Sequence, residues 1–412
     1  MNFDVCMSSA TVESDRNDLD QWGERLMAQS RGALNAAGFV TAYGAHSIAA
    51  GLGVESLSMG VGVLTLAVIL AVYDIAEVIL KPVFGYISDR VGVKPVIVIG
   101  LAAFAAISFV GLFATTPIPI ALVRFGQGAA AAAFSPAASS AVARLSSPET
   151  LGRHFGRYGS WKGLGYTLGP LIGAGLILVG GFPALFLSLA VSASAVAIWV
   201  AVSMPALNVL PRPRYTVLDL ARQIGNSRFL IPVAALAVAT GSLGVAVGFL
   251  PLIGSHLHLN IFVSVGAVTV LALTSSLIQP RIGRLRDTGR LEPRAGIPAG
   301  MSAIAAGLLL VATIPSPATI YVAALLLGAG IGTATTLGFT QLATTTPHER
   351  MGRTMGTAEL GREAGDAGGP LLVGAIASVA TLGIGLAALG GVAIVAAALT
   401  GAFSSKKSEL PR

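Results

Sequence analysis

The sequence contains little charge, because Asp, Glu, Lys and Arg make up only 11% of its 412 residues, against about 25% in ordinary soluble domains. So few charges cannot cover a water-facing surface, which excludes a soluble enzyme and a disordered chain. A single cysteine, Cys6, excludes a disulfide scaffold. Aromatic residues amount to 6%, whereas glycine occurs 51 times, and such small residues allow membrane helices to pack closely against one another.

What the sequence has instead is a series of apolar segments about 20 residues long, the length of a helix that crosses a bilayer. We predict an all-α membrane protein with 12 transmembrane helices in two six-helix bundles. Outer-membrane barrels are excluded, since their apolar residues alternate in shorter segments. The predicted spans are 32–54, 58–80, 95–115, 117–142, 155–180, 182–204, 229–253, 261–280, 295–314, 317–342, 353–379 and 381–403.

The basic residues predict the orientation of these spans. Lys and Arg follow every even-numbered span, whereas the loops after odd-numbered spans contain only Glu55, His256 and His258 as charged or titratable residues. Loops rich in Lys and Arg face the cytoplasm, so we expect a multi-pass protein of the cytoplasmic membrane with both termini cytoplasmic. The net charge of +7 is therefore explained by the basic residues of the cytoplasmic loops, and it predicts no nucleic-acid partner.

The chain also contains an internal duplication. We predict a cytoplasmic tail at 1–31, bundles at 32–204 and 229–403, a central cytoplasmic loop at 205–228, and a second tail at 404–412. Paired bundles repeated in the same direction predict a carrier whose substrate lies between them near the membrane midplane. Gly156, Gly165, Gly169 and Pro170 recur 200 residues later, and Pro82, Gly85 and Asp89 recur 198 residues later.

Three motifs carry a family resemblance. Residues 85–95, with Gly85, Asp89, Arg90 and Gly92, form a predicted tight cytoplasmic turn that resembles the signature loop of the major facilitator superfamily, with Val93 in place of a basic residue. Residues 124–128 resemble its fourth-helix motif. The fifth span is similar to the antiporter motif of the drug–proton antiporters, through Gly156, Gly165, Gly169, Pro170 and Gly173.

The resemblance implies a secondary transporter that exports a small organic molecule in exchange for protons by alternating access. Arg124 corresponds to the proton-coupling arginine of the drug–proton antiporters. We expect it to act on Asp74 and Glu77 as proton-titrating candidates, because an intramembrane charge is functional by default. The alternative for Arg124 is a packing role, with its guanidinium bonded to backbone carbonyls.

Spans 2 and 11 carry the candidate gate. Glu359, Arg362, Glu363 and Asp366 share one side of a helix. By resemblance, span 11 faces span 2, where Lys81 lies at the depth of Glu359 and Glu77 lies near Arg362. We predict salt bridges across this seam that close the cytoplasmic side together with Asp89. The alternative is that each set is satisfied within its own helix.

The predicted substrate cavity draws on several spans. Lys162 matches Arg362 in the duplication, so one alternative function is proton-coupled transport of an organic anion; another is a transport-silent membrane sensor. The threonines could instead bond only within their own helix, and His46 could be an ordinary interior histidine. The predicted cavity residues are Asn35, Tyr43, His46, Gln127, Lys162, Thr333, Thr336, Thr340, Glu363 and Asp366.

The sequence predicts no catalytic group, metal site or cofactor. His256 and His258 have no neighbouring carboxylate or Cys, and no Walker loop is present to bind ATP. The expected partners are a small-molecule substrate, protons and the lipid bilayer, and the expected state is a monomer.

Overall fold

The computed structural model describes residues 27–48, 63–207, 227–259 and 261–405. Within these residues the chain forms 12 helices and no strand, because α5 contains two helices separated by the non-helical Gly180 and Gly181. The helices are residues 27–48, α2 Val63–Val91, α3 Val93–Gly111, α4 Pro117–Arg144, α5 Leu151–Ser203, α7 Ser227–His256, α8 Ile261–Asp287, α9 Pro293–Thr313, α10 Pro317–Thr345, α11 Met351–Val379 and α12 Leu382–Ser405, with a 3₁₀ turn at His348–Arg350.

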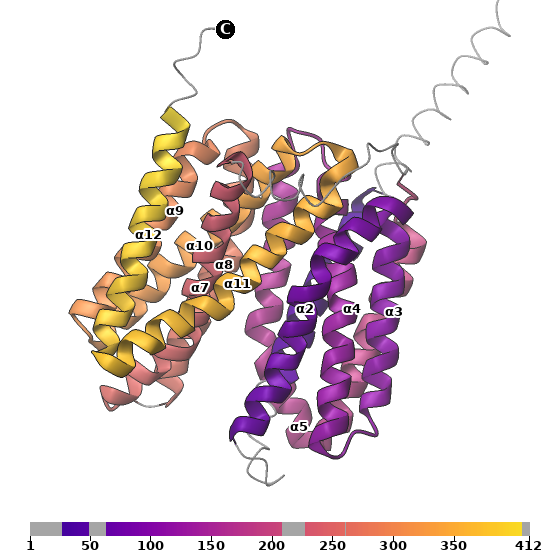
Figure 1. Ribbon diagram of the computed structural model, residues 1–412, viewed down its shortest axis with the longest axis horizontal. Helices are drawn as coiled ribbons and strands as arrows, with labels where there is room; N and C mark the ends of the chain where they lie inside the picture. The colour runs from indigo at the N-terminus through magenta and orange to yellow at the C-terminus, as the bar shows by residue number, and fades with distance from the viewer. Residues whose placement is uncertain (1–26, 49–62, 208–226, 260, 406–412) are drawn as a thin grey trace, which may run out of the picture.

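The helices form two bundles side by side, one from residues 27–48 to the end of α5 and the other from α7 to α12 (Figure 1). The predicted all-α fold with two six-helix bundles is confirmed. Seven helices are long and apolar enough to cross a membrane on composition alone. Helix α11 is not among them, since the charged residues Glu359, Arg362, Glu363 and Asp366 interrupt its apolar sequence.

One predicted loop is wrong in its form. Residues 85–91 belong to α2, and the turn into α3 is Gly92 alone, whose φ of 100° favours glycine. The helix continues because its last turns pack on α11: a Cβ on Gly85 would lie 2.7 Å from the carbonyl oxygen of Gly352. The predicted central loop at 205–228 falls largely outside the described residues, as do most of the predicted tails at 1–31 and 404–412.

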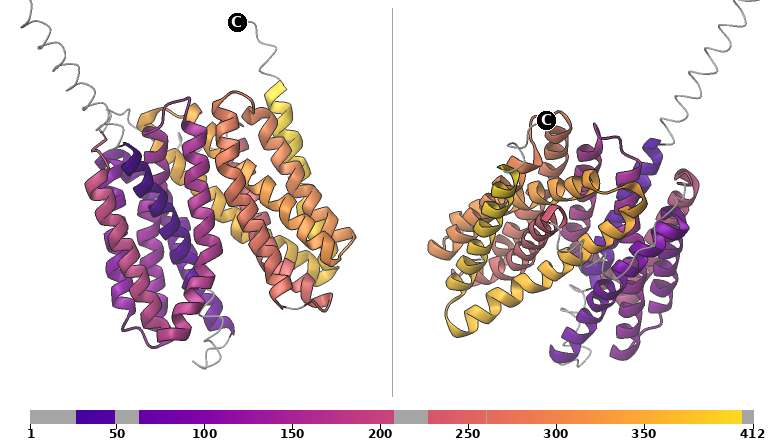
Figure 2. Two further views of the ribbon diagram at one scale, coloured as in Figure 1. Left: turned by 180° about the vertical axis from the view of Figure 1, so that it is seen from behind. Right: turned by 45° about the horizontal axis from the view of Figure 1, so that its top comes forward.

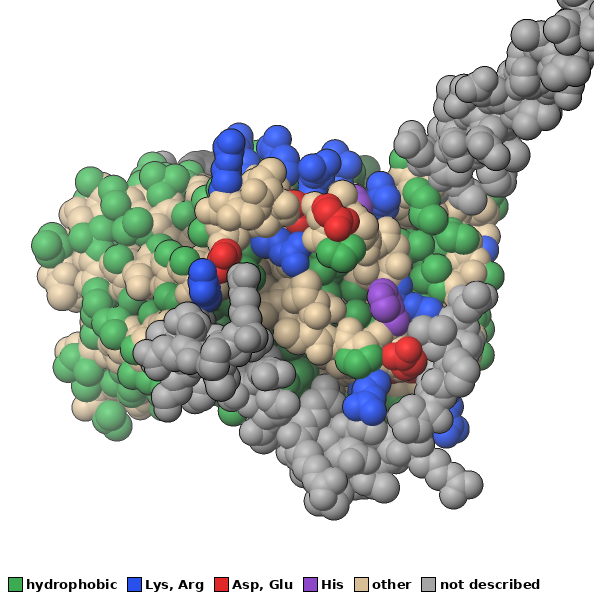
Figure 3. Space-filling view, turned by 90° about the horizontal axis from the view of Figure 1, so that it is seen from above, with side chains coloured by type: hydrophobic (Ala, Val, Ile, Leu, Met, Phe, Trp, Pro, Cys, Tyr) green, Lys and Arg blue, Asp and Glu red, His purple; other side chains and the backbone are tan. Residues whose placement is uncertain are grey.

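One end of the molecule gathers the basic side chains. The connections α2–α3, α4–α5, α8–α9 and α10–α11 lie there, and Figure 3 looks onto this end, where Lys and Arg side chains are prominent. We call it the basic end. The described chain begins and ends there, at residues 27 and 405, whereas the break in α5 lies at the opposite end.

The two bundles are joined at the basic end, where α2 crosses α11 and α5 crosses α8 (Figure 2). Asp89 accepts hydrogen bonds from the backbone N–H groups of Gly352 and Arg353, at 2.9 and 3.0 Å. Asp287 accepts from Gly152 and Arg153, at 2.8 and 2.7 Å. Each carboxylate thus binds the positive N-terminus of a helix in the other bundle.

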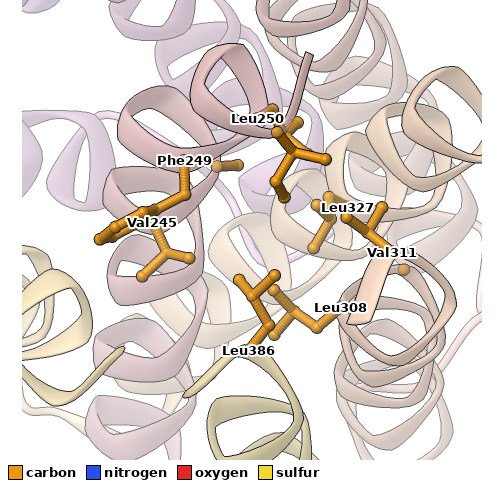
Figure 4. Close-up of a pocket in the computed structure, with 10 residues that line it drawn as sticks. Val245, Phe249, Leu250, Leu308, Val311, Leu327 and Leu386 are labelled. Atoms are coloured by element: carbon orange, nitrogen blue, oxygen red, sulfur yellow. The ribbon is translucent and has the colours of Figure 1, made fainter. Parts of the chain in front are cut away.

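The second bundle has a dry core. Figure 4 shows Leu250, Leu308, Val311 and Leu327 pointing toward one another around a cavity of about 10 Å³ with a wholly apolar lining. A space of this size holds at most one water molecule, and nothing polar would hold it there. This cavity is therefore a packing gap and not a candidate binding site.

Candidate substrate and ion site between the bundles

The first charge cluster joins α2 to α11. The Nζ atom of Lys81 lies 2.6 Å from Oε2 of Glu77, one turn earlier on α2, and 2.7 Å from Oε1 of Glu363 on α11. Lys81 is fully buried and Glu77 is 4% exposed. One ammonium therefore bridges a carboxylate from each bundle.

The second cluster joins α5 to α11. Nζ of Lys162 lies 3.2 Å from Oε2 of Glu359, and Nη1 of Arg362 lies 3.3 Å from the same oxygen. Arg362 also donates a 2.7 Å hydrogen bond to the hydroxyl of Tyr166. Glu359 is fully buried, and one cation from each bundle neutralises its charge.

These pairs differ from the predicted ones. Lys81 was expected opposite Glu359, and Glu77 opposite Arg362; instead Lys81 contacts Glu363, one turn further along α11. The reason is that Lys162 of α5 takes Glu359, and Arg362 stays bound to Glu359 within α11. Pairs across the seam and pairs within one helix therefore occur together.

The two clusters balance their charge. Three cations face three carboxylates, and each is buried or nearly so. Removing one member of a buried pair leaves an uncompensated charge, at a cost of about 3–5 kcal/mol. Protonation of one carboxylate would likewise leave a cation in excess, so this arrangement can respond to proton binding.

A cavity of about 60 Å³ lies beside the second cluster, between the bundles. One water molecule needs about 10–15 Å³ on this measure of volume, so the cavity has room for a few water molecules. Three buried polar atoms of its lining, the hydroxyl of Tyr158, Oε1 of Gln279 and Nε of Arg362, have no hydrogen-bond partner among the described residues. Its lining is Phe155, Tyr158, Gly159, Lys162, Gly163, Tyr166, Thr240, Leu243, Ser275, Gln279, Ile331, Thr335, Phe339, Glu359 and Arg362.

Backbone carbonyl groups bind the side chain of Arg124. It donates to the carbonyl oxygens of Gly44 and Ala45, at 3.1 and 3.3 Å, and lies 4.1 Å from the ring centre of Tyr73. Within the described residues it forms no ion pair with Asp74 or Glu77. Its link to Glu77 runs through Tyr73, whose hydroxyl donates to Oε1 of Glu77 at 3.3 Å.

Two carboxylates stand outside both clusters. Asp74 is exposed, and Asp366 is partly buried beside Gly244 of α7. Neither forms a hydrogen bond or an ion pair in the part of the chain that the structure describes. On their helices they lie on the side of the ion pairs away from the basic end.

The predicted cavity residues of the first helix and of α4 are held by neighbours in their own bundle. Tyr43 is bonded to Ser188, and Gln127 donates to Ser108 at 2.9 Å. His46 lies 3.1 Å from the carbonyl of Ala42 and packs edge-on against the ring of Tyr166. Asn35 is buried. None of these predicted residues lines the 60 Å³ cavity.

Two of the three predicted threonines of α10 bond within their helix. Thr333 and Thr340 donate to the carbonyls of Ala329 and Thr336, whereas the hydroxyl of Thr336 is buried without a partner among the described residues. The cavity is lined instead by Thr335.

The glycines of the antiporter motif lie in helix contacts. Gly156 lies against the backbone of α8, whereas Gly165, Gly169 and Gly173 lie against residues 39–47 of the first helix. Pro170 lies within α5.

Sequence reasoning missed Tyr158, Tyr166 and Gln279 as lining residues. Gln279 had a usable signal, since the 198-residue repeat relates it to Lys81. No feature of the sequence pointed to the two tyrosines, apart from the rarity of tyrosine in the chain.

The sequence model of the Major Facilitator Superfamily matches residues 33–370 and 233–410. The chain belongs to this superfamily. It is therefore a multi-pass membrane protein of a transporter family. The motifs on α2, α4 and α5, the two bundles and the charges between them agree with that assignment.

Relatives in bacteria are similar over a limited stretch. The multidrug resistance protein MdtG of Klebsiella pneumoniae (strain 342) is 32% identical over 117 residues, and that of Salmonella newport (strain SL254) is 31% identical over 116. The match spans 28% of this chain and 28% to 29% of those proteins.

Solved structures share the fold over nearly the whole chain. The human organic anion transporter MFSD10 (TETRAN) superposes with a TM-score of 0.71 at 17% identity, over 91% of this chain and 98% of that one. The Escherichia coli fucose:proton symporter FucP gives 0.72 at 15% identity, over 90% and 98%.

Proposed function

We propose that the chain is a secondary active transporter of the cytoplasmic membrane that exports a small organic molecule in exchange for protons, as a monomer. The observation that carries the proposal is the charge-balanced cluster on α2, α5 and α11, in which Lys81 pairs with Glu363 across the two bundles. The limited similarity to the multidrug resistance protein MdtG supports export.

The proposed coupling starts from the state with the basic end closed. Protons enter from the opposite end, where Asp74 is exposed, and pass to Glu77. Neutral Glu77 leaves Lys81 with one carboxylate, which weakens the hold of α2 on α11. The basic end then opens toward the cytoplasm, the proton leaves, and substrate binds in its place. A ligand shifts the equilibrium between the closed and the open basic end only if it binds the two states with different affinity. In this proposal the proton is that ligand.

Proteoliposomes with an internal pH dye and an imposed proton gradient test this proposal. Candidate cations, neutral drugs and organic anions are added one at a time, to wild type and to Glu77→Gln. We expect substrate-triggered proton flux opposite to the substrate, and loss of that flux in Glu77→Gln. Glu292→Gln, the same change at an exposed position between α8 and α9, is the matched control and should retain the flux. Flux in the same direction as the substrate would refute antiport.

A second candidate is transport of an organic anion. Lys162 and Arg362 both line the cavity, and Nε of Arg362 is buried without a partner among the described residues. An anionic group could displace Glu359 from these cations. In the same assay, Lys162→Gln would then abolish transport of organic anions and spare that of organic cations. Retained transport of organic anions would exclude this candidate.

A further inference from the structure

An apolar groove of about 350 Å³ lies between α2, α3 and α4 on the outside of the first bundle. Its floor is one face of α4, where Gly126, Ala129, Ala130 and Ala133 follow helical spacing. These small side chains allow α2 and α3 to pack closely along α4. Helices α2 and α3 contact each other little, which leaves the groove between them. The walls are Phe84, Ile87, Val91, Pro95, Val96, Ile99, Gly100, Ala103 and Ile107.

The groove opens toward lipid and spans about one leaflet. Val91 and Ile99 in its walls are 57% and 67% exposed, as expected for side chains that face hydrocarbon. From Pro95 to Ile107 the α3 wall rises about 18 Å at about 1.5 Å per residue, a little over half of a hydrocarbon core about 30 Å thick. The groove therefore runs from the basic end to the middle of the membrane.

The basic end of the groove is positively charged. Arg90 directly precedes the wall residue Val91, and Lys94 directly precedes Pro95. Neither forms an ion pair within the described chain. The adjacent carboxylate, Asp89, is directed to the N-terminus of α11. The N-terminus of α3 adds positive charge, since Gly92 provides no side-chain cap.

We propose that this groove binds one anionic phospholipid, with an acyl chain over the small residues of α4 and its phosphate beside Arg90 and Lys94. A hydrocarbon chain fits a lining without polar side chains, and a negative headgroup complements the two cations. A polar substrate would find no hydrogen-bond partner there. The site is separate from the ion clusters, which lie between the bundles.

The test uses the purified full chain in detergent and native mass spectrometry, with phosphatidylglycerol and phosphatidylcholine of identical acyl chains. We expect one phosphatidylglycerol to bind about tenfold more tightly than phosphatidylcholine, as two interfacial cations allow. Ala129→Phe fills the floor and should abolish binding of both lipids. Ala398→Phe, the same change at an exposed position of α12, should leave binding unchanged.

A second pair of variants tests the headgroup contact. Arg90→Gln with Lys94→Gln should lower phosphatidylglycerol binding to the level of phosphatidylcholine. Arg284→Gln with Arg290→Gln, which removes two exposed cations from the basic end of the second bundle, should retain the preference. Glycerol phosphate alone should not displace the lipid.

Three results would overturn the proposal. Equal affinity of the wild type for the two lipids would remove the headgroup contact. Wild-type binding by a folded Ala129→Phe protein would place the lipid elsewhere. Displacement by glycerol phosphate would indicate a site for a free anion, in which the groove has no part.

Discussion

The two helix crossings at the basic end use matching positions with different chemistry. Where α2 has Lys81, α8 has Gln279, 198 residues later; where α11 has Glu359 and Glu363, α5 has Gly159 and Gly163, 200 residues earlier. At the α2–α11 crossing an ammonium contacts carboxylates. At the α5–α8 crossing a neutral amide lies against glycines.

The difference indicates how each crossing is held. A Cβ on Gly283 of α8 would overlap the carbonyl oxygen of Gly152, and a Cβ on Gly85 of α2 would lie 2.7 Å from that of Gly352, so both crossings are tight and the first is the tighter. The α5–α8 crossing is the closer one, and close packing holds it together with the hydrogen bonds to Asp287. The charged crossing depends on ion pairs, which a proton can break. We therefore expect separation of the bundles to begin at α2 and α11.

The largest expected effect comes from removing the bridging cation. Lys81→Met leaves Glu77 and Glu363 buried without their counter-ion and should destabilise the protein by about 3–5 kcal/mol. Gln279→Met at the matching position should cost about 1 kcal/mol. Thermal unfolding in detergent compares the two variants. Equal losses would show that the crossings are not held differently.

A charge exchange across the α2–α11 crossing sharpens the comparison. Lys81→Glu and Glu363→Lys should each strongly reduce coupled proton flux, because each places like charges together in a buried site. The double variant restores opposite charges and should exceed either single variant about tenfold in flux, as expected for directly coupled residues. A double variant as inactive as the singles would disprove this direct pair.

The helix N-termini offer a smaller effect at each crossing. Asp89→Asn should weaken the bonds to the first turn of α11, and Asp287→Asn those to α5, by about 1 kcal/mol each. Hydrogen exchange should then rise about fivefold in residues 351–355 for the first variant and in residues 151–155 for the second. A rise in both segments with either variant would mean that the crossings open as one unit.

The smallest expected effect concerns one hydroxyl of the second cluster. Tyr166→Phe removes the hydrogen bond from Arg362 and should cost about 1 kcal/mol, with the Lys162–Glu359 pair retained. Coupled flux in proteoliposomes should fall about fivefold. Tyr321→Phe, which removes a bond to the carbonyl of Val263, should leave the flux unchanged. Equal flux in both variants would exclude Tyr166 from the coupling.

Much of the fold was predictable from local sequence, because membrane helices are defined by the length of their apolar segments. The helix starts at Pro117, Pro317 and Leu382 lie within one residue of the predicted ones. The signature segment at 85–91 was predicted as a turn since it holds glycines and charges. Its helical form depends on packing against α11, which belongs to the other bundle.

The candidate site was predictable in its residues but not in its pairs. Charges within apolar segments identify Glu77, Lys81 and Glu363 without a structure. Which of them meet depends on how far each helix slides and tilts, and one helical turn is about 5.4 Å. The partner of Glu359 also comes from a third helix, α5, as Lys162. Sequence spacing along α2 and α11 carries no information about that residue.

The break in α5 has a practical consequence for establishing sidedness. Gly180 and Gly181 connect two helices at the end opposite the basic one; Gly181 has a φ of 65°, and the preceding Val179 is 89% exposed. A short epitope inserted between these glycines would interrupt no helix and displace no buried side chain. Antibody access to it in intact cells, compared with inside-out vesicles, would report directly which face of the membrane this end occupies.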